Sequence, residues 1–144
     1  MLYFDSNYVL KCYLPEAGAH HVRALAARPV TKSCSRLGRA EVIAALHRKV
    51  REGSLTRPQL RAVWARVLAD EAAGVWTWLP FDTTVEHAVE QAFLGLAAKV
   101  FLRTGDAIHL ATAALHGFTE IHSHDRHLLA AAGAFGLTGV DVVP

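Results

Sequence analysis

Two aspartates stand at the ends of short segments whose residues are typical of buried strands. Asp5 follows the apolar run 2–4, and Asp125 comes just after the segment 120–123. A short apolar run bounded by polar residues predicts a strand inside a parallel sheet. In such sheets the carboxyl ends of the strands line the crevice that binds ligands. The sequence therefore predicts that Asp5 and Asp125 lie at the same edge of one sheet.

Two further carboxylates lie on or beside apolar faces of predicted helices. Glu41 comes four residues after Leu37, and Asp106 comes four residues before Leu110. Side chains at this spacing share a helix face. All four carboxylates also have ordinary roles open to them. Either strand-end aspartate can cap the helix that follows, Asp106 can interact favourably with a helix dipole, and Glu41 can pair with an arginine.

The chemistry of these four groups depends on whether the fold brings them together. Four carboxylates at one sheet edge would repel one another and raise each other's pKa values. Mg²⁺ removes that conflict because it binds oxygen ligands and needs only a few direct carboxylates. A divalent cation held in this way activates water and stabilises charge on a phosphate during in-line displacement. Convergence of the four would therefore make a site for phosphate chemistry.

Length and composition indicate one globular domain over residues 1–144. The hydrophobic fraction of 52% excludes a chain that is disordered throughout. Because an acid stands at position 5 and no apolar stretch is long enough for a membrane helix, we expect neither a signal peptide nor a membrane span. Cys12 and Cys34 make no disulfide framework, which favours a reducing, cytoplasmic setting.

Basic residues are concentrated in one part of the chain, although the formal net charge is only +2. Residues 23–66 hold 11 Lys and Arg with two acids, whereas residues 67–144 hold three with nine. This asymmetry indicates a surface for a polyanion, and a solvated helical face is the alternative. The candidates for contact with the phosphates of a nucleic acid lie in two successive predicted helices and are Arg48, Arg51, Arg57 and Arg61.

Strand and helix patterns alternate along the chain. We predict strands over 2–4, from 29 onward, and over 75–81, 120–123 and 140–143. We predict helices over 6–14, 16–28, from 33 or 35 to 52, and over 56–74, 83–99, 104–115 and 126–132. Capping boxes begin two of these helices, at Thr56 and Thr83. The alternation is typical of an α/β sandwich with a mainly parallel sheet.

Four segments of the chain resemble, in order and spacing, the four motif blocks of PIN-domain proteins, especially the VapC-type toxin ribonucleases. The segments are YFDSNYVLKCYLPE, SRLGRAEVIAALHRKVREGSL, RTGDAIHLATAALHG and IHSHDRHLLAAAGAFGL. The resemblance covers nearly the whole chain, and the first and third segments are its most specific parts. It implies a three-layer α/β/α sandwich with a central, mainly parallel sheet.

The resemblance also implies a metal site. The acids of the family that bind Mg²⁺ or Mn²⁺ and support phosphodiester hydrolysis correspond to Asp5, Glu41, Asp106 and Asp125. Ser6 matches the small hydroxyl residue that follows the first aspartate and helps to order the site. Ser123 and His124 depart from the pattern, since many relatives have threonine and then an apolar or aromatic residue there. Ser123 remains a candidate for positioning the neighbouring acids.

The function implied by the resemblance is a Mg²⁺-dependent endoribonuclease that uses metal-activated water. Such a protein would be the toxin of a toxin–antitoxin pair, cytoplasmic and homodimeric, with RNA as substrate and an antitoxin as partner. One alternative is a PIN-fold nuclease of RNA maturation without an antitoxin. The other is a non-catalytic PIN-fold module that binds RNA or protein, although retention of all four acids argues against it.

Histidines on both sides of Asp125 suggest a competing zinc site. The run HSHDRH is similar to the zinc motif of metallo-β-lactamase-like hydrolases. Its histidines would suit zinc better than Mg²⁺, since imidazole is a typical zinc ligand. However, the aspartate stands one position too early, and no later histidine completes a dinuclear site. We therefore interpret the three histidines as polar residues around a strand end, and whether His124 or His127 contributes to the site stays open.

Other conspicuous side chains have simpler interpretations. We expect His109 to be hydrogen-bonded in the interior. We expect Trp64, Trp76 and Trp78 to pack in the core or at a dimer contact rather than to stack on bases.

Overall fold

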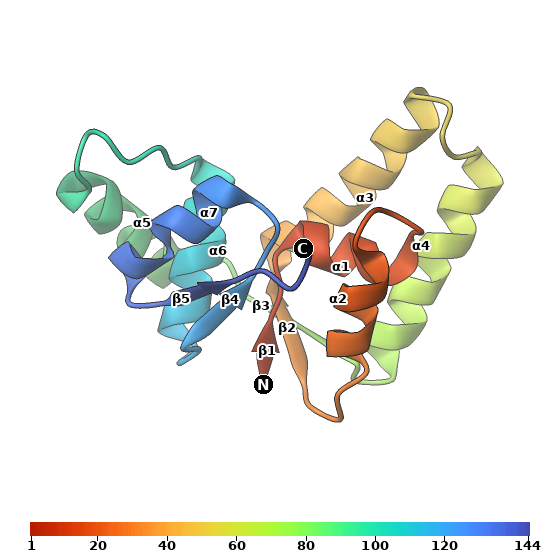
Figure 1. Ribbon diagram of the computed structural model, residues 1–144, viewed down its shortest axis with the longest axis horizontal. Coiled ribbons are helices and arrows are strands. Elements are labelled where there is room, and N and C mark those ends of the chain that lie inside the picture. The colour runs from red at the N-terminus through yellow and green to blue at the C-terminus, as the bar shows by residue number, and fades with distance from the viewer.

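Five short strands alternate with seven α-helices along residues 1–144, all of which the computed structural model describes (Figure 1). The strands are β1 (Leu2–Tyr3), β2 (Lys32–Ser35), β3 (Trp76–Leu79), β4 (Glu120–His122) and β5 (Thr138–Val140). The helices are α1 (Ser6–Tyr13), α2 (Ala19–Ala26), α3 (Arg36–Arg51), α4 (Arg57–Ala72), α5 (Thr83–Gly95), α6 (Thr104–Leu115) and α7 (Arg126–Ala131), followed by the 3₁₀ turn η1 (Ala132–Phe135).

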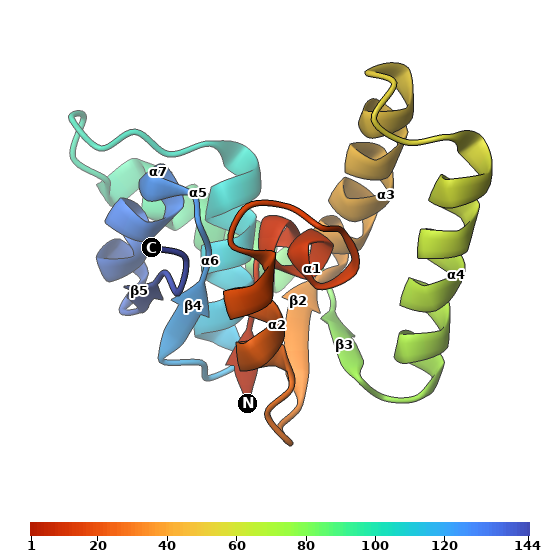
Figure 2. The ribbon, with the colours of Figure 1, turned by 45° about the vertical axis from the view of Figure 1, so that its right-hand side comes forward.

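The strands form a parallel arrangement in the spatial order β3-β2-β1-β4-β5. Strands β1, β2 and β3 form one continuous set of hydrogen-bonded ladders, and β4 pairs with β5 in a separate ladder. A single parallel bridge between Phe4 and His122 joins the two ladders. Helices lie on both sides of the strands, with α6 packed against β2 and β4 (Figures 1 and 2). The predicted α/β/α sandwich with a parallel sheet is confirmed.

The order in which successive strands are added to the sheet changes side at β1. From β1 the chain moves outward to β2 and β3, and it then returns to place β4 and β5 on the other side of β1. Open α/β sheets bind ligands at such a switch point, beyond the carboxyl ends of the strands. Asp5 follows β1 and Ser123 follows β4, so polar side chains stand at this position.

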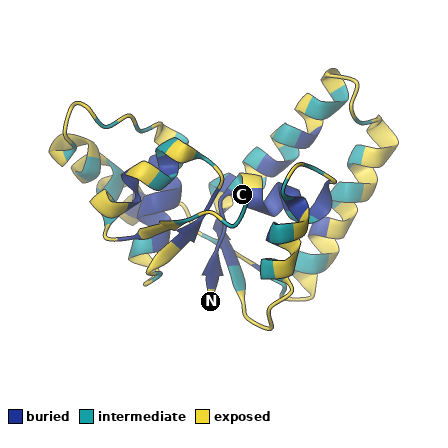
Figure 3. Cartoon of the chain, viewed as in Figure 1, coloured by how far each residue is buried: buried dark blue, intermediate teal, exposed yellow.

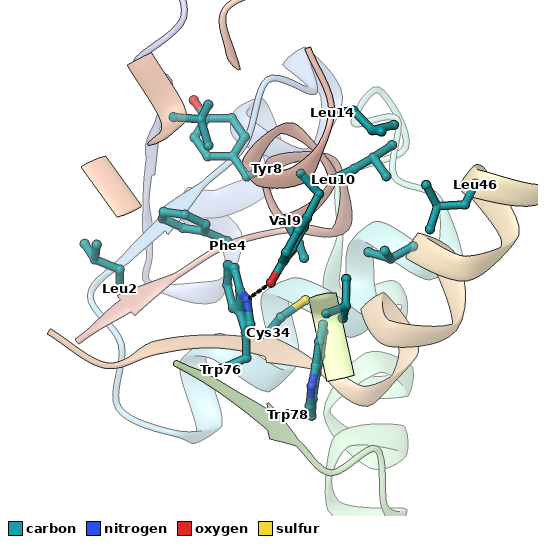
Figure 4. Packing of buried hydrophobic residues seen from close by; sticks show 14 residues of the cluster. Leu2, Phe4, Tyr8, Val9, Leu10, Leu14, Cys34, Leu46, Trp76 and Trp78 are labelled. Carbon is teal, nitrogen blue, oxygen red and sulfur yellow. Dashed lines mark hydrogen bonds between the residues drawn. The ribbon is translucent and has the colours of Figure 1, made fainter. Parts of the chain in front are cut away.

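The largest core cluster lies around β1, β2 and β3, beneath α1 and α3. Phe4, Tyr8, Trp76 and Trp78 pack together there, and Figure 4 shows them at close range. The ring nitrogen of Trp76 donates a hydrogen bond of 2.7 Å to the Tyr13 hydroxyl, which satisfies the polar edge of that indole. The expectation that Trp76 and Trp78 are core residues is correct.

Burial falls off away from the sheet. The strands are mostly buried, whereas the distal ends of α3 and α4 and the segment after α5 are largely exposed (Figure 3). None of the helices combines the length and the apolar character that crossing a bilayer requires.

The last strand lies at 138–140, so the predicted strand at 140–143 is wrong except for Val140. Residues 141–143 turn toward α1 because side chains there bind them. The Tyr8 hydroxyl donates to Asp141 at 2.7 Å and accepts from the backbone N–H of Val142 at 2.8 Å. A contact between residues 133 positions apart outweighs the β-propensity of the valines.

Several predicted helix ends also differ from the structure. The helix predicted over 16–28 begins only at Ala19, because Gly18 adopts a left-handed conformation with φ of 73°. The helix that begins at Thr83 is capped by Asp82, which accepts from the backbone N–H groups of Thr84 and Val85, and it ends at Gly95 rather than Lys99. The capping box at Thr56 is confirmed with both of its hydrogen bonds.

Candidate active site

A cavity of about 450 Å³ lies at the switch point of the sheet. Asp5 beyond the end of β1, the start of α1, the helices α3 and α6, and the start of α7 supply its lining residues. All four candidate carboxylates line it. The polar residues around it are Asp5, Ser6, Asn7, Glu41, Arg48, Arg103, Asp106, His109 and Asp125. The fold thus brings together residues that are up to 120 positions apart in the sequence.

Asp5 is the most deeply buried of the four carboxylates, with 3% of its surface exposed. It caps α1 through a 2.8 Å hydrogen bond from the backbone N–H of Tyr8. Its other oxygen accepts a 2.6 Å hydrogen bond from the Ser123 hydroxyl. Burial raises the pKa of Asp5 from 3.8 to about 6, although both hydrogen bonds oppose the rise. Asp5 is therefore a carboxylate held in place at some electrostatic cost.

We expect Asp5→Asn to stabilise the metal-free protein at neutral pH by about 1–2 kcal/mol. The folded state raises the pKa of Asp5 from 3.8 to about 6, so ionisation destabilises the fold progressively between those pH values and fully above them. Asparagine removes a cost of roughly 3 kcal/mol, offset in part by the lost Ser123 hydrogen bond.

Thermal unfolding in EDTA at several pH values tests this expectation. The advantage of the variant should be present at about pH 7 and disappear below about pH 3, where wild-type Asp5 is protonated in both the folded and the unfolded state. A difference between the two proteins that does not change with pH would contradict the expected origin of the effect.

Ser123 connects Asp5 to the next carboxylate. While its hydroxyl donates to Asp5, its oxygen accepts a 2.9 Å hydrogen bond from the backbone N–H of Asp125. Asp125 caps α7, accepting from the backbone N–H groups of His127 at 2.8 Å and Leu128 at 3.4 Å. Ser123 is fully buried. It thus fixes the separation of the two strand ends.

The pKa of Asp125 lies below its ordinary value. Partial burial alone would raise that pKa. The two backbone hydrogen bonds and the positive charge of Arg103 outweigh burial. Asp125 is therefore ionised over the whole neutral pH range. It also fills both roles considered for it from the sequence, since it caps α7 and lines the cavity.

Asp106 lies in the first turn of α6 and projects into the cavity. Its Oδ2 atom is buried and makes no hydrogen bond. The Arg103 Nε atom lies 3.2 Å away, so the two form an ion pair whose geometry is too poor for a hydrogen bond. Burial raises the pKa of Asp106, and the charge of Asp125 raises it further against the opposing effect of Arg103. A buried carboxylate oxygen without a hydrogen bond is suited to a cation.

Glu41 is held by a chain of buried polar groups. Its Oε2 atom lies 2.9 Å from His109 Nε2, and His109 Nδ1 lies 3.1 Å from the Tyr3 hydroxyl. An ionised carboxylate can only accept, so His109 Nε2 donates to Glu41, and the Tyr3 hydroxyl also accepts from the backbone N–H of Ser35. Burial alone would raise the pKa of Glu41, but the His109 hydrogen bond and the Ser6 hydroxyl lower it.

Gly38 allows α3 to approach α6 closely enough for this contact. A Cβ atom at this position would overlap the Cys34 sulfur and lie 2.9 Å from the His109 ring. His109 is 2% exposed, as expected for a hydrogen-bonded interior histidine. Its partner Glu41 makes it part of the cavity wall as well.

The four candidate RNA-contacting arginines do not lie together. Arg48 lines the cavity. Arg51, Arg57 and Arg61 are exposed farther out, where α3 ends and α4 begins (Figure 1). They can reach a polyanion only along the outer part of the helical hairpin.

The histidines around Asp125 lie outside the cavity. His122 is buried, and its Nδ1 atom lies 3.1 Å from the Tyr3 carbonyl oxygen. His124 contacts the Asp141 carboxylate at 2.7 Å, so it anchors the C-terminal segment. The ring of His127 packs edge-on against Phe101. None of the three lines the cavity.

Arg103 is a cavity residue that sequence reasoning missed. Its guanidinium contacts both Asp106 and Asp125. The sequence carries one signal for it, since Arg103 stands three positions before Asp106 at a helix start and is thus within reach of it. The second contact spans 22 positions and has no local signal.

The donor set fits a hard divalent cation in its chemistry. Carboxylate oxygens are the ligands that Mg²⁺ prefers, and Asp106 Oδ2 has no hydrogen bond to lose. The carboxylates line one cavity, yet no three acidic, histidine or cysteine side chains are grouped as closely as metal ligands are. Arg103 stands between the two carboxylates from α6 and α7.

Fold and cavity together define an α/β/α protein with a parallel sheet and an acidic pocket at its switch point. A family model described as the PIN domain matches residues 2–134. The chain belongs to the PIN-domain family, and the resemblance seen in its sequence is confirmed. No curated protein sequence matches the chain.

Several solved structures share the fold over almost their whole length. FitAcB from Neisseria gonorrhoeae has 17% identity and a TM-score of 0.72, covering 99% of this chain and 98% of that one. VapBC2 from Rickettsia felis, bound to a promoter DNA fragment, has 12% identity and a TM-score of 0.70, covering 98% of each. A toxin–antitoxin complex from Klebsiella pneumoniae has 19% identity and a TM-score of 0.63, covering 99% and 98%. At these identities the likeness shows the fold.

Proposed function

We propose that this chain is a divalent-metal-dependent endoribonuclease and the toxin of a toxin–antitoxin pair. The observation that carries the proposal is the convergence of four carboxylates on one cavity in a chain of the PIN-domain family. Two of the proteins that share its fold are described as parts of VapBC2 and of a toxin–antitoxin complex. Their descriptions support a cognate antitoxin as partner.

Three aspartates and one glutamate take different parts in this proposal. Asp5, Asp106 and Asp125 would hold Mg²⁺ or Mn²⁺, with Glu41 as a further ligand or as a base. The cation, when bound, supplies activation of water and neutralisation of charge on the phosphate. Ser123 and the α1 backbone keep Asp5 in position. His109 keeps Glu41 ionised and oriented, so that its free oxygen can accept a proton from water.

RNA would be bound along the basic hairpin that α3 and α4 form. Arg48 at the cavity would contact phosphates close to the cleaved bond, and Arg51, Arg57 and Arg61 would contact phosphates farther along the strand. Because phosphate contacts carry no base information, they position RNA without selecting its sequence. A homodimer would extend this surface.

Cleavage of RNA should require Mg²⁺ or Mn²⁺ and stop in excess chelator. Four carboxylates line the cavity, and a bound cation would supply the activation of water and the neutralisation of phosphate charge that hydrolysis needs. Burial raises the pKa of the Cys34 thiol, which disfavours its thiolate as a nucleophile. The measurement is the cleavage of a labelled RNA with EDTA, followed by restoration with each metal in excess. Full activity in EDTA, with no metal found in the purified protein, would contradict the mechanism.

A further inference from the structure

One guanidinium bridges two of the carboxylates that line the cavity, Asp106 and Asp125. Arg103 Nη2 lies 2.6 Å from Asp125 Oδ2, and Arg103 Nε lies 3.2 Å from Asp106 Oδ2. Asp106 comes from α6 and Asp125 from the start of α7, so the arginine joins two separate elements. Its positive charge reduces the repulsion between these two carboxylates.

The bridge is not a buried structural ion pair. The Arg103 side chain is 54% exposed, whereas the carboxylates that it contacts are 16% and 20% exposed. The residue stands at the N-terminus of α6, but its side chain makes no cap hydrogen bond. Its guanidinium carbon lies 5.9 Å from the ring of Phe101, which is itself exposed. The guanidinium can therefore swing into solvent by side-chain rotation alone.

The atoms that Arg103 contacts are the atoms that a metal ion would need. Asp106 Oδ2 has no hydrogen bond, and Asp125 Oδ2 receives only the arginine, since the backbone bonds go to Oδ1. Two cations cannot share these two oxygens at contact distance without strong repulsion. A divalent ion that binds both carboxylates must displace the guanidinium.

We propose that Arg103 is a built-in counter-ion that yields the Asp106 and Asp125 oxygens to the divalent metal and then binds the substrate phosphate at the same cavity. The inference rests on the proposed nuclease function. A displaced guanidinium stays tethered at the rim of the cavity, because its backbone is fixed at the start of α6. Its planar set of donors matches two phosphate oxygens at once, which an ammonium group does not do.

Metal affinity tests the first half of this proposal. We would titrate Mn²⁺ into the wild-type protein, Arg103→Gln and Arg126→Gln, and measure Kd by calorimetry without RNA. Arg126→Gln is a matched control, because it removes the same charge at an exposed residue beside Asp125. Arg126 forms no ion pair with a carboxylate. Arg103→Gln should lower the Kd about two- to fivefold more than the control, the range of a partly exposed ion pair.

RNA cleavage at saturating Mn²⁺ tests the second half. Arg103→Gln should cleave about tenfold or more slowly despite its tighter metal binding, because a charged donor to the phosphate is lost. Arg103→Lys should recover part of the rate, since it keeps the charge but not the paired donors. Arg126→Gln should cleave as the wild type does.

The possible results separate the inference from the function on which it rests. Equal Mn²⁺ affinities of Arg103→Gln and Arg126→Gln would overturn the competition between arginine and metal. Tighter Mn²⁺ binding with an unchanged or faster cleavage rate would overturn the phosphate contact and leave a purely inhibitory arginine. Wild-type protein that binds Mn²⁺ but cleaves no RNA would overturn the nuclease function, while the affinity comparison would still decide the competition.

Discussion

Asp106→Asn is expected to reduce RNA cleavage by about a thousandfold or more, since each factor of ten corresponds to ~1.4 kcal/mol and a metal ion supplies several. Asparagine keeps the size and one oxygen of the side chain but removes the charge that a cation needs. Asp106 supplies a buried oxygen that no hydrogen bond occupies. Unlike Asp5 and Asp125, it caps no helix, so loss of its charge should change activity far more than stability.

The matched control for this variant is Asp82→Asn. Asp82 is also an aspartate at the start of a helix, but it is exposed and lies outside the cavity. Cleavage rates at saturating Mg²⁺, with melting temperatures recorded in EDTA, give both readouts. If Asp106→Asn cleaves as fast as Asp82→Asn, then Asp106 does not belong to the catalytic site.

Expression of the chain alone is expected to arrest bacterial growth, and co-expression with its genomic neighbour should relieve the arrest. A toxin nuclease must be silenced while its host grows. The basic region 23–66 offers a surface to an acidic or flexible partner segment, and the acidic cavity accepts a cationic side chain for the reason that it accepts a metal ion. The two chains should co-purify.

The inactive variant separates toxicity from misfolding. Asp106→Asn expressed at the same level should permit growth and should still co-purify with the neighbour. High-level wild-type expression without arrest would favour a PIN nuclease without an antitoxin if the purified protein cleaves RNA. The same result without cleavage would favour the non-catalytic binding module.

The positions of Asp5 and Asp125 followed from a simple rule, because parallel strands place their carboxyl ends at one edge. The alternatives considered for these residues were a helix cap and a site residue, and the structure shows that the cap is real for both. A cap and a cavity wall are compatible because a carboxylate has two oxygens. Sequence reasoning treated the two roles as competitors only because it assigned one role to a whole side chain.

Other features depend on contacts that no local pattern carries. The choice of Asp82 over Thr83 as a cap is a choice between adjacent residues that both favour that position. The end of the last strand depends on Tyr8, and the bridge made by Arg103 depends on where α7 begins relative to α6. Tertiary packing decides each of these features, so hydrophobic periodicity and residue propensity along the sequence do not predict them.

The central place of β1 has a consequence for how the protein is made. β1 emerges from the ribosome before the other strands, and it can pair with β2 once about residue 35 is available. Its other neighbour comes far later, since Ser123 follows Asp5 by 118 positions. While the nascent chain is still short of β4, it therefore has one wall of the crevice and lacks the other. The proposed nuclease would thus lack Asp106 and Asp125, two of its four carboxylates, until the segment 104–125 has emerged and folded.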